Sequence, residues 1–179
     1  MTEFEHVRAE TLFSGFVFDV ERRHLSADGV AFTREIVVHP GAVAIVAVDD
    51  QNRVVLLEQY RASIGQRQLE IPAGTCDVLG EELQATAIRE LIEETGFEPA
   101  VVTELGSFYN SSGYCNQKTV VFLATSLKEI GRAPAGPEEI DSTVHLVDLA
   151  EAVAMVGSGQ ILEGTAAFGL LMAARAYGL

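Results

Sequence analysis

The chain has 179 residues, 48% apolar and 21% charged, with a formal net charge of −14 from 26 acidic and 12 basic residues. This size and composition suit one ordered domain with at most a small appendage, and the acidic balance argues against a nucleic-acid or anionic-membrane surface, which needs a basic footprint. The two cysteines are too few for a disulfide scaffold. The polar N-terminus has no signal-peptide character, and no apolar run is long enough for a transmembrane helix, so a cytoplasmic protein is expected.

The first part of the chain is rich in predicted strands. Residues 11–20 and 30–38 contain many β-branched and aromatic residues, and the polar SADG at 26–29 lies between them as in a hairpin. Residues 41–50 form a nearly unbroken apolar run, which predicts a strand buried on both faces. Turn residues then lead into another strand at 53–61.

A single helix follows these strands. Residues 67–74, RQLEIPAG, predict a short strand that is stopped by Pro72 and Gly74. A helix is expected at about 82–95, with an acidic first turn that suits the positive end of the helix dipole. Gly96 is placed to cap the C-terminal end of this helix.

The second half of the chain predicts strands first and helices last. Many strands around one helix, followed by helices, are typical of an α+β fold with helices packed on a mixed sheet. The first 40 residues either join that sheet or form a small one of their own, and we divide the chain into an N-terminal β-segment, 1–38, and a main domain, 39–179. The remaining predicted elements are strands at 101–109 and 118–127 around a loop at 110–117, an acidic Gly/Pro loop at 131–141, a strand at 142–149, and helices at 150–159 and 164–179.

Three glutamates crowd one face of the first predicted helix. Glu90, Glu93 and Glu94 are spaced so that their like charges repel by about 0.2–0.5 kcal/mol per pair. Arg89 lies four residues before Glu93 and can pair with it, which fixes the direction of that side chain. Oriented carboxylates are hard ligands that suit Mg²⁺ or Mn²⁺, and the backbone carbonyl of Ala73 is placed to complete such a site. A merely solvated acidic face is the alternative.

The residues around this helix resemble the Nudix box, G-x₅-E-x₇-R-E-U-x-E-E-x-G-U, where U is aliphatic or aromatic. The chain supplies Gly74, Glu81 and the run RELIEETGF from Arg89 to Phe97. Every fixed position from Glu81 onward fits. At a given starting position, a random sequence would contain the motif's arginine, three glutamates and glycine between Arg89 and Gly96 on the order of once in a million. One departure is that Gly74 and Glu81 are separated by six residues instead of five.

The stretch before the box, residues 34–74, is similar to that of ADP-ribose pyrophosphatases. The resemblance implies a Nudix-type α/β/α sandwich with a mixed sheet, preceded by a β-rich segment that is exchanged in a homodimer. It also implies a small-molecule nucleoside diphosphate derivative as the partner and metal-dependent hydrolysis of its diphosphate bond, with Mg²⁺ or Mn²⁺. The substrate implied most directly is ADP-ribose, cleaved to AMP and ribose 5-phosphate.

The resemblance also assigns roles to individual residues. Arginines contact substrate phosphates or ribose in the family, because the guanidinium fork matches phosphate oxygens. Exposed arginine is common, so a surface role is the alternative for each of them. The residues matched are the metal ligands Ala73, Glu90, Glu93 and Glu94, the substrate-binding residues Arg34, Arg61, Glu70 and Gly113, and the catalytic residues Arg89, Glu93, Glu138 and Glu139.

A base is needed to activate the attacking water. In the subfamily it often comes from an acidic loop after the sheet, where this chain has GPEEID with Glu138 and Glu139. We favour Glu139, because its E-x-D match before a strand aligns less ambiguously. Glu93 is the rival base, and a solvated acidic loop is the alternative to both.

The loop after the box departs from the subfamily at two positions. Ser-Pro-Gly and a glutamate four residues after the glycine are usual there, whereas this chain has Ser112 in place of the proline and Gln117 in place of the glutamate. UDP- or GDP-sugars therefore stay open as substrates. A non-catalytic module that senses nucleotide sugars is a further alternative, but such a module normally loses the glutamates and gains a basic segment, so an enzyme is favoured.

Overall fold

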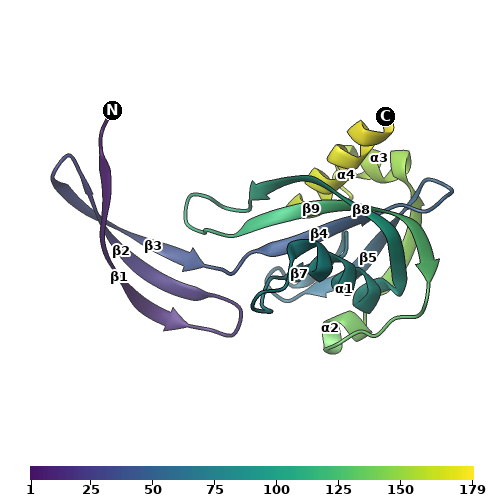
Figure 1. Ribbon diagram of the computed structural model, residues 1–179, viewed down its shortest axis with the longest axis horizontal. Coiled ribbons are helices and arrows are strands. Elements are labelled where there is room, and N and C mark those ends of the chain that lie inside the picture. Colours follow the sequence, from purple (N-terminus) through teal and green to yellow (C-terminus); the bar gives the residue numbers. More distant parts are fainter. The chain divides into compact units, whose positions relative to one another are not determined.

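The computed structural model describes residues 1–179, which form two compact units. One unit comprises Met1–Gly41 with Phe108–Lys118, and the other comprises Ala42–Ser107 with Thr119–Leu179. Figure 1 shows the elements of both units along the chain. None of the helices has the length and apolarity that crossing a lipid bilayer requires.

The smaller unit is built on an antiparallel three-stranded sheet of its own. Its strands are β1 (Phe4–Ser14), β2 (Asp19–Ala27) and β3 (Val30–Val38), in that order. Asp28 and Gly29, both with positive φ, make the turn between β2 and β3, so the expected hairpin at this position is confirmed. The first 40 residues therefore form a separate sheet.

The single strand predicted at 11–20 is wrong, because the chain reverses at Gly15. The Gly15 amide donates to the Phe18 carbonyl oxygen at 3.1 Å. A Cβ on Gly15 would lie 2.8 Å from that oxygen and 2.7 Å from the Phe13 ring, so a residue with a side chain does not fit this turn. The turn separates β1 from β2, a strand whose many charged residues hid it from pattern analysis.

Large apolar side chains of this unit are exposed to an unusual degree for a folded sheet. Phe16 at the β1–β2 turn is fully exposed, and β1 and β3 carry further examples. A sheet with so much exposed apolar surface is marginal unless something covers it. The exposed residues include Phe4, Val7, Leu12, Phe13, Phe16, Val17, Phe18 and Val30.

The larger unit contains two sheets. In the four-stranded sheet, β4 runs parallel to β9 and antiparallel to β7, so this sheet is mixed as expected. The other sheet has three strands, and its central strand is antiparallel to both neighbours. The strand orders are β7 (Ala73–Thr75), β4 (Ala42–Ala47), β9 (Lys118–Glu129) and β8 (Phe97–Tyr109), and then β10 (Thr143–Asp148), β5 (Arg53–Arg61) and β6 (Gln66–Glu70).

Helices cover both faces of β4 (Figure 1). On one face, Val43 and Ile45 belong to the core cluster that contains Ala87 and Leu91 of α1. On the other face, Val46 lies so close to α4 that a Cβ on Gly169 would be 2.9 Å from its side chain. The prediction of a strand buried on both faces is confirmed, and so is the α+β class. The helices are α1 (Leu83–Thr95), α2 (Pro137–Ile140), α3 (Leu149–Ser158) and α4 (Gly164–Tyr177).

Three local expectations around α1 and α2 need correction. Gly74 does not stop a strand but lies within β7, which pairs with β4. The first turn of α1 carries no acid, because the helix begins after Glu82, and its capping by left-handed Gly96 is as predicted. The loop expected at 131–141 contains α2, since Pro137 presets the helical φ at its first position.

Candidate active site

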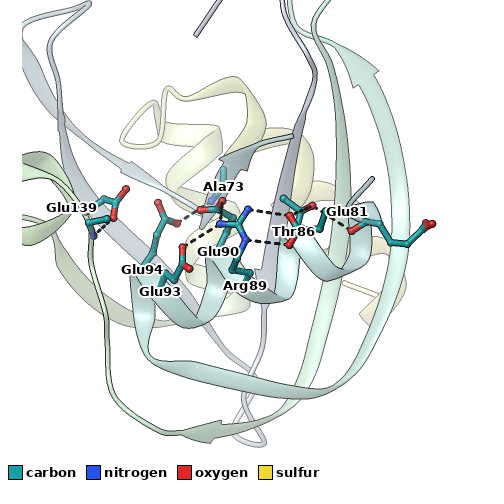
Figure 2. A network of polar contacts seen from close by, with 10 residues as sticks. Ala73, Glu81, Thr86, Arg89, Glu90, Glu93, Glu94 and Glu139 are labelled. Atoms are coloured by element: carbon teal, nitrogen blue, oxygen red, sulfur yellow. Dashed lines mark hydrogen bonds and ion pairs between the residues drawn. The ribbon is translucent and has the colours of Figure 1, made fainter. Parts of the chain in front are cut away.

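Arg89 joins three glutamates into a network along α1 (Figure 2). Its Nη1 donates to Glu90 Oε1 at 2.8 Å and to Glu93 Oε2 at 3.2 Å, and its Nη2 donates to Glu81 Oε2 at 3.2 Å. The predicted pairing of Arg89 with Glu93 is therefore present. Hydrogen bonding, first of all to Glu81, raises the pKa of Arg89, and the same contact lowers the pKa of Glu81. The arginine stays charged and fixes the directions of these carboxylates.

Glu94 is a buried carboxyl, with only 6% of its surface exposed. Its Oε2 accepts a hydrogen bond from the Ala73 amide at 3.1 Å. Burial raises the pKa of Glu94 to about 8 in spite of that bond, and the charges of Glu90 and Glu139 raise it further while Arg61 lowers it. A carboxylate in such surroundings needs a nearby cation to ionise without a large penalty.

Gly74 makes room for Glu90. A Cβ on Gly74 would lie 2.1 Å from the Glu90 Cδ, so any side chain at this position would displace the carboxylate. Burial raises the pKa of Glu90, and the Arg89 charge only partly offsets this effect. The glycine that opens the Nudix-like motif therefore has a physical function here, although the loop after it is one residue longer than the motif has it.

The donors around Glu90 and Glu94 fit a divalent metal. They are hard carboxylate oxygens, two of them largely buried, in a cradle that a Cβ at Gly74 would fill. In this conformation no three acidic side chains converge as a complete ligand set. Glu90 and Glu93 each direct one oxygen to Arg89, and Glu94 directs one oxygen to the Ala73 amide, so each carboxylate keeps a second oxygen for an ion.

The structure brings Glu139 to these carboxylates. Its charge raises the pKa of both Glu90 and Glu94. Figure 2 shows Glu139 beyond the Glu94 end of the network. The Ala135 amide donates to its Oε2 at 2.6 Å, so the carboxylate is fixed in direction.

Arg61 and Glu70, both matched to substrate-binding residues, bind each other. Arg61 Nε donates to both carboxylate oxygens, at 2.9 and 3.1 Å, and Nη2 donates to Oε2 at 2.5 Å. Hydrogen bonding to Glu70 raises the pKa of Arg61, and the charges of Glu94 and Glu163 act in the same direction. The buried Glu70 therefore holds a permanently charged guanidinium on the side of Glu94.

Arg34 and Gly113 belong to the smaller unit. Arg34 Nη1 donates to the Thr33 carbonyl at 2.7 Å, and its guanidinium lies 4.9 Å from the centre of the Phe32 ring. Gly113 is in the loop after β8, and nothing would obstruct a Cβ there. The substrate-binding roles of both residues stay predictions.

Sequence reasoning missed the residues that hold α2. Arg132 binds the backbone around Glu139, and Arg67 forms an ion pair with Asp141 just after the helix. One signal was available for the first of these, since Arg132 is the only basic residue in the acidic stretch 131–141. Nothing in the sequence marked Glu163, whose charge raises the pKa of Arg61 because the fold brings α4 to this side.

Comparison with known proteins shows the family of the chain. A family model described as the NUDIX domain matches residues 38–163. The ADP-ribose pyrophosphatase of Mycobacterium tuberculosis is 40% identical over 170 residues, covering 94% of this chain and 82% of that protein. The ADP-ribose pyrophosphatase of Bacillus subtilis is 35% identical over 169 residues, covering 94% of this chain and 91% of that one. The crystal structure of an ADP compounds hydrolase aligns with a TM-score of 0.86 at 23% identity, covering 98% and 95% of the two chains, which confirms the predicted sandwich fold.

Proposed function

This chain belongs to the Nudix family, and on that premise we propose that it hydrolyses ADP-ribose to AMP and ribose 5-phosphate with the help of Mg²⁺ or Mn²⁺. The observation that carries the proposal is the juxtaposition of Glu90, Glu94 and Glu139 beside the Glu70-anchored Arg61. Identity of 40% to an ADP-ribose pyrophosphatase over 94% of the chain supports this substrate.

The metal would be held by Glu90, Glu93 and Glu94, together with the Ala73 carbonyl. When bound, a divalent ion neutralises charge on the diphosphate oxygens and lowers the pKa of a coordinated water. The fold holds several carboxylates close together, and because these repel one another without a cation, they favour binding of a divalent ion. Arg89 binds one oxygen of Glu90 and one of Glu93 and is itself held by Glu81, so it would keep both carboxylates directed while their other oxygens bind the ion.

Arg61 would orient the diphosphate. Glu70 engages its Nε and Nη2, so Nη1 is left to meet a phosphate oxygen with its direction already set. Glu70 thus acts on the substrate through the arginine. Arg34 and Gly113 would be further substrate contacts, as the family resemblance implies.

Glu139 would accept the proton of the attacking water. It faces the carboxylates that surround the reacting centre, and the Ala135 amide orients its carboxylate. Glu93 is the rival, because it lies on the same helix face and pairs only with Arg89. Glu138 is the weaker candidate of the three.

We further propose that the chain is a homodimer in which residues 1–38 of one subunit help to build the pocket of the other. The exposed phenylalanines and valines of β1, β3 and the β1–β2 turn support this, because a two-fold exchange would cover them. The two free cysteines agree with a reducing, cytoplasmic location, which is part of the same proposal.

Other nucleotide sugars remain the second candidate, because Ser112 and Gln117 replace the residues usual in the subfamily. The experiment is a comparison of kcat/KM for ADP-ribose, a UDP-sugar and a GDP-sugar with Mg²⁺ present. We expect ADP-ribose to be preferred by at least about tenfold, roughly 1.4 kcal/mol of transition-state binding. A preference for the UDP- or GDP-sugar would change the proposed substrate but not the proposed reaction. Binding of these compounds without turnover of any of them would identify a sensing module.

A further inference from the structure

The segment between β9 and β10 is fastened to the last turn of α1. The Ile130 amide donates to the Gly96 carbonyl at 2.8 Å, and the Ala133 amide donates to the Glu93 carbonyl at 3.1 Å. Gly96 has a φ of +79°, and a Cβ on it would lie 2.7 Å from the Gly131 carbonyl carbon. The glycine therefore serves two purposes: it ends the helix, and it lets this segment approach closely.

Arg132, in that segment, forms hydrogen bonds with Glu139 and with Ser142 just after α2. Its Nη2 donates to the Glu139 carbonyl at 3.1 Å and to Ser142 Oγ at 2.6 Å, while Nη1 donates to the Ser142 carbonyl at 3.1 Å. Ser142 is buried, and its hydroxyl donates to the same Glu139 carbonyl at 2.7 Å. Nε is shielded from solvent and has no hydrogen-bond partner, so the terminal nitrogens alone make the contact.

The same segment also fixes the side chain of Glu139. The Ala135 amide, three residues after Arg132, donates to Glu139 Oε2 at 2.6 Å. Both the backbone and the carboxylate of Glu139 are therefore attached to residues 130–135, which are attached in turn to Gly96 and Glu93 of α1. A short continuous path connects the helix of the glutamates with the base.

We propose that Arg132, together with Ser142, is a positioning residue that sets the distance between Glu139 and the carboxylates of α1. This inference rests on the proposed function, since it assigns Arg132 to the base of that reaction. The hydrogen bonds of the Arg132 side chain go to the loop backbone and one hydroxyl, so it acts on the reaction through Glu139. A displacement of about 1 Å in such a group costs on the order of a hundredfold in rate.

An arginine is needed here because two carbonyls and a hydroxyl are bridged at once. The guanidinium presents its donors in a rigid fork, whereas a lysine ammonium is a compact point charge that does not span them. Arg132→Lys therefore keeps the charge and loses the geometry. If the charge alone mattered, this variant would behave as the wild type does.

The first measurement is amide hydrogen exchange of the 136–142 peptide in the wild type, Arg132→Lys and Arg53→Met. Arg53 is the matched control, because it is a half-buried arginine that binds Asp49 away from α2. We expect exchange at 136–142 to rise at least about tenfold in Arg132→Lys only, with α1 unchanged. Unchanged exchange would overturn the proposal. This readout requires no substrate, so it stands even if ADP-ribose hydrolysis fails.

The second measurement is kcat and KM of Arg132→Lys, alone and combined with Glu139→Gln. We expect kcat to fall about 10–100-fold with KM within about threefold, and we expect the substitution to have little further effect once Glu139 is already replaced. An equal fall in both backgrounds would mean a general structural role and would overturn the proposal. Ser142→Ala, which removes one bond to the Glu139 carbonyl, is expected to lower kcat in the same way by a smaller factor, and it serves if Arg132 variants do not fold.

Discussion

Replacing Glu94 by glutamine is expected to stabilise the metal-free protein while destroying its activity. With a pKa of about 8 in the folded protein and 4.5 in the unfolded chain, the carboxyl opposes folding at pH 7 by on the order of 3 kcal/mol, since each pKa unit is worth about 1.4 kcal/mol. Glutamine keeps an oxygen for the Ala73 amide and has no charge to bury.

The effect has a defined dependence on pH. Because the folded-state pKa of Glu94 is raised, the folded protein binds this proton more tightly than the unfolded chain does, and stability is lost as the pH rises from 4.5 toward 8. The stability of Glu94→Gln relative to the wild type should therefore grow by about 2–3 kcal/mol between pH 5 and pH 7. Neither protein should contain metal in this comparison.

Urea unfolding with a chelator at pH 5 and pH 7 measures this difference, and steady-state kinetics with Mg²⁺ measures activity. Glu98→Gln, an exposed residue four positions later, is the control and should change neither. We expect Glu94→Gln to lower kcat by at least about a hundredfold. A stability difference that is the same at both pH values, or near-normal kcat with unchanged metal dependence, would refute the assignment of Glu94 as a buried ligand.

Three further outcomes are expected. Chelation should abolish hydrolysis and added Mg²⁺ or Mn²⁺ should restore it, so activity that persists in a chelator would exclude metal dependence. Glu139→Gln should lower kcat about a hundredfold and Glu138→Gln less than about threefold, and the reverse order would move the base to Glu138. Light scattering should give about twice the 19.2 kDa of one chain, and a mass near 19.2 kDa would end the dimer proposal.

Local patterns predicted the larger unit well, because its elements depend on short-range signals. The apolar run of β4, the turn before β5 and the glycine cap of α1 each follow from a few adjacent residues. The charged strand β2 was not predicted from the sequence, since a nine-residue stretch of mostly charged and polar residues is as typical of a loop as of a strand. Pairing with two neighbours decided its conformation.

The same distinction between local and long-range signals applies to the candidate site. The glutamates of α1 and their partner Arg89 were visible as spacing within one helix. The pairing of Arg61 with Glu70, and the grip of Arg132 on the Glu139 carbonyl, join residues on different elements, so no local pattern carried them. The sequence pointed to which residues matter but not to which of them hold each other.

The most direct test of the account is ³¹P NMR of ADP-ribose incubated with the wild-type protein and Mg²⁺. We predict that the two diphosphate resonances disappear together and that AMP and ribose 5-phosphate appear in equal amounts, at least about a hundredfold more slowly when Glu94 is replaced by glutamine. An unchanged diphosphate spectrum with wild-type protein and metal, or the same products from Glu94→Gln at the same rate, would contradict it.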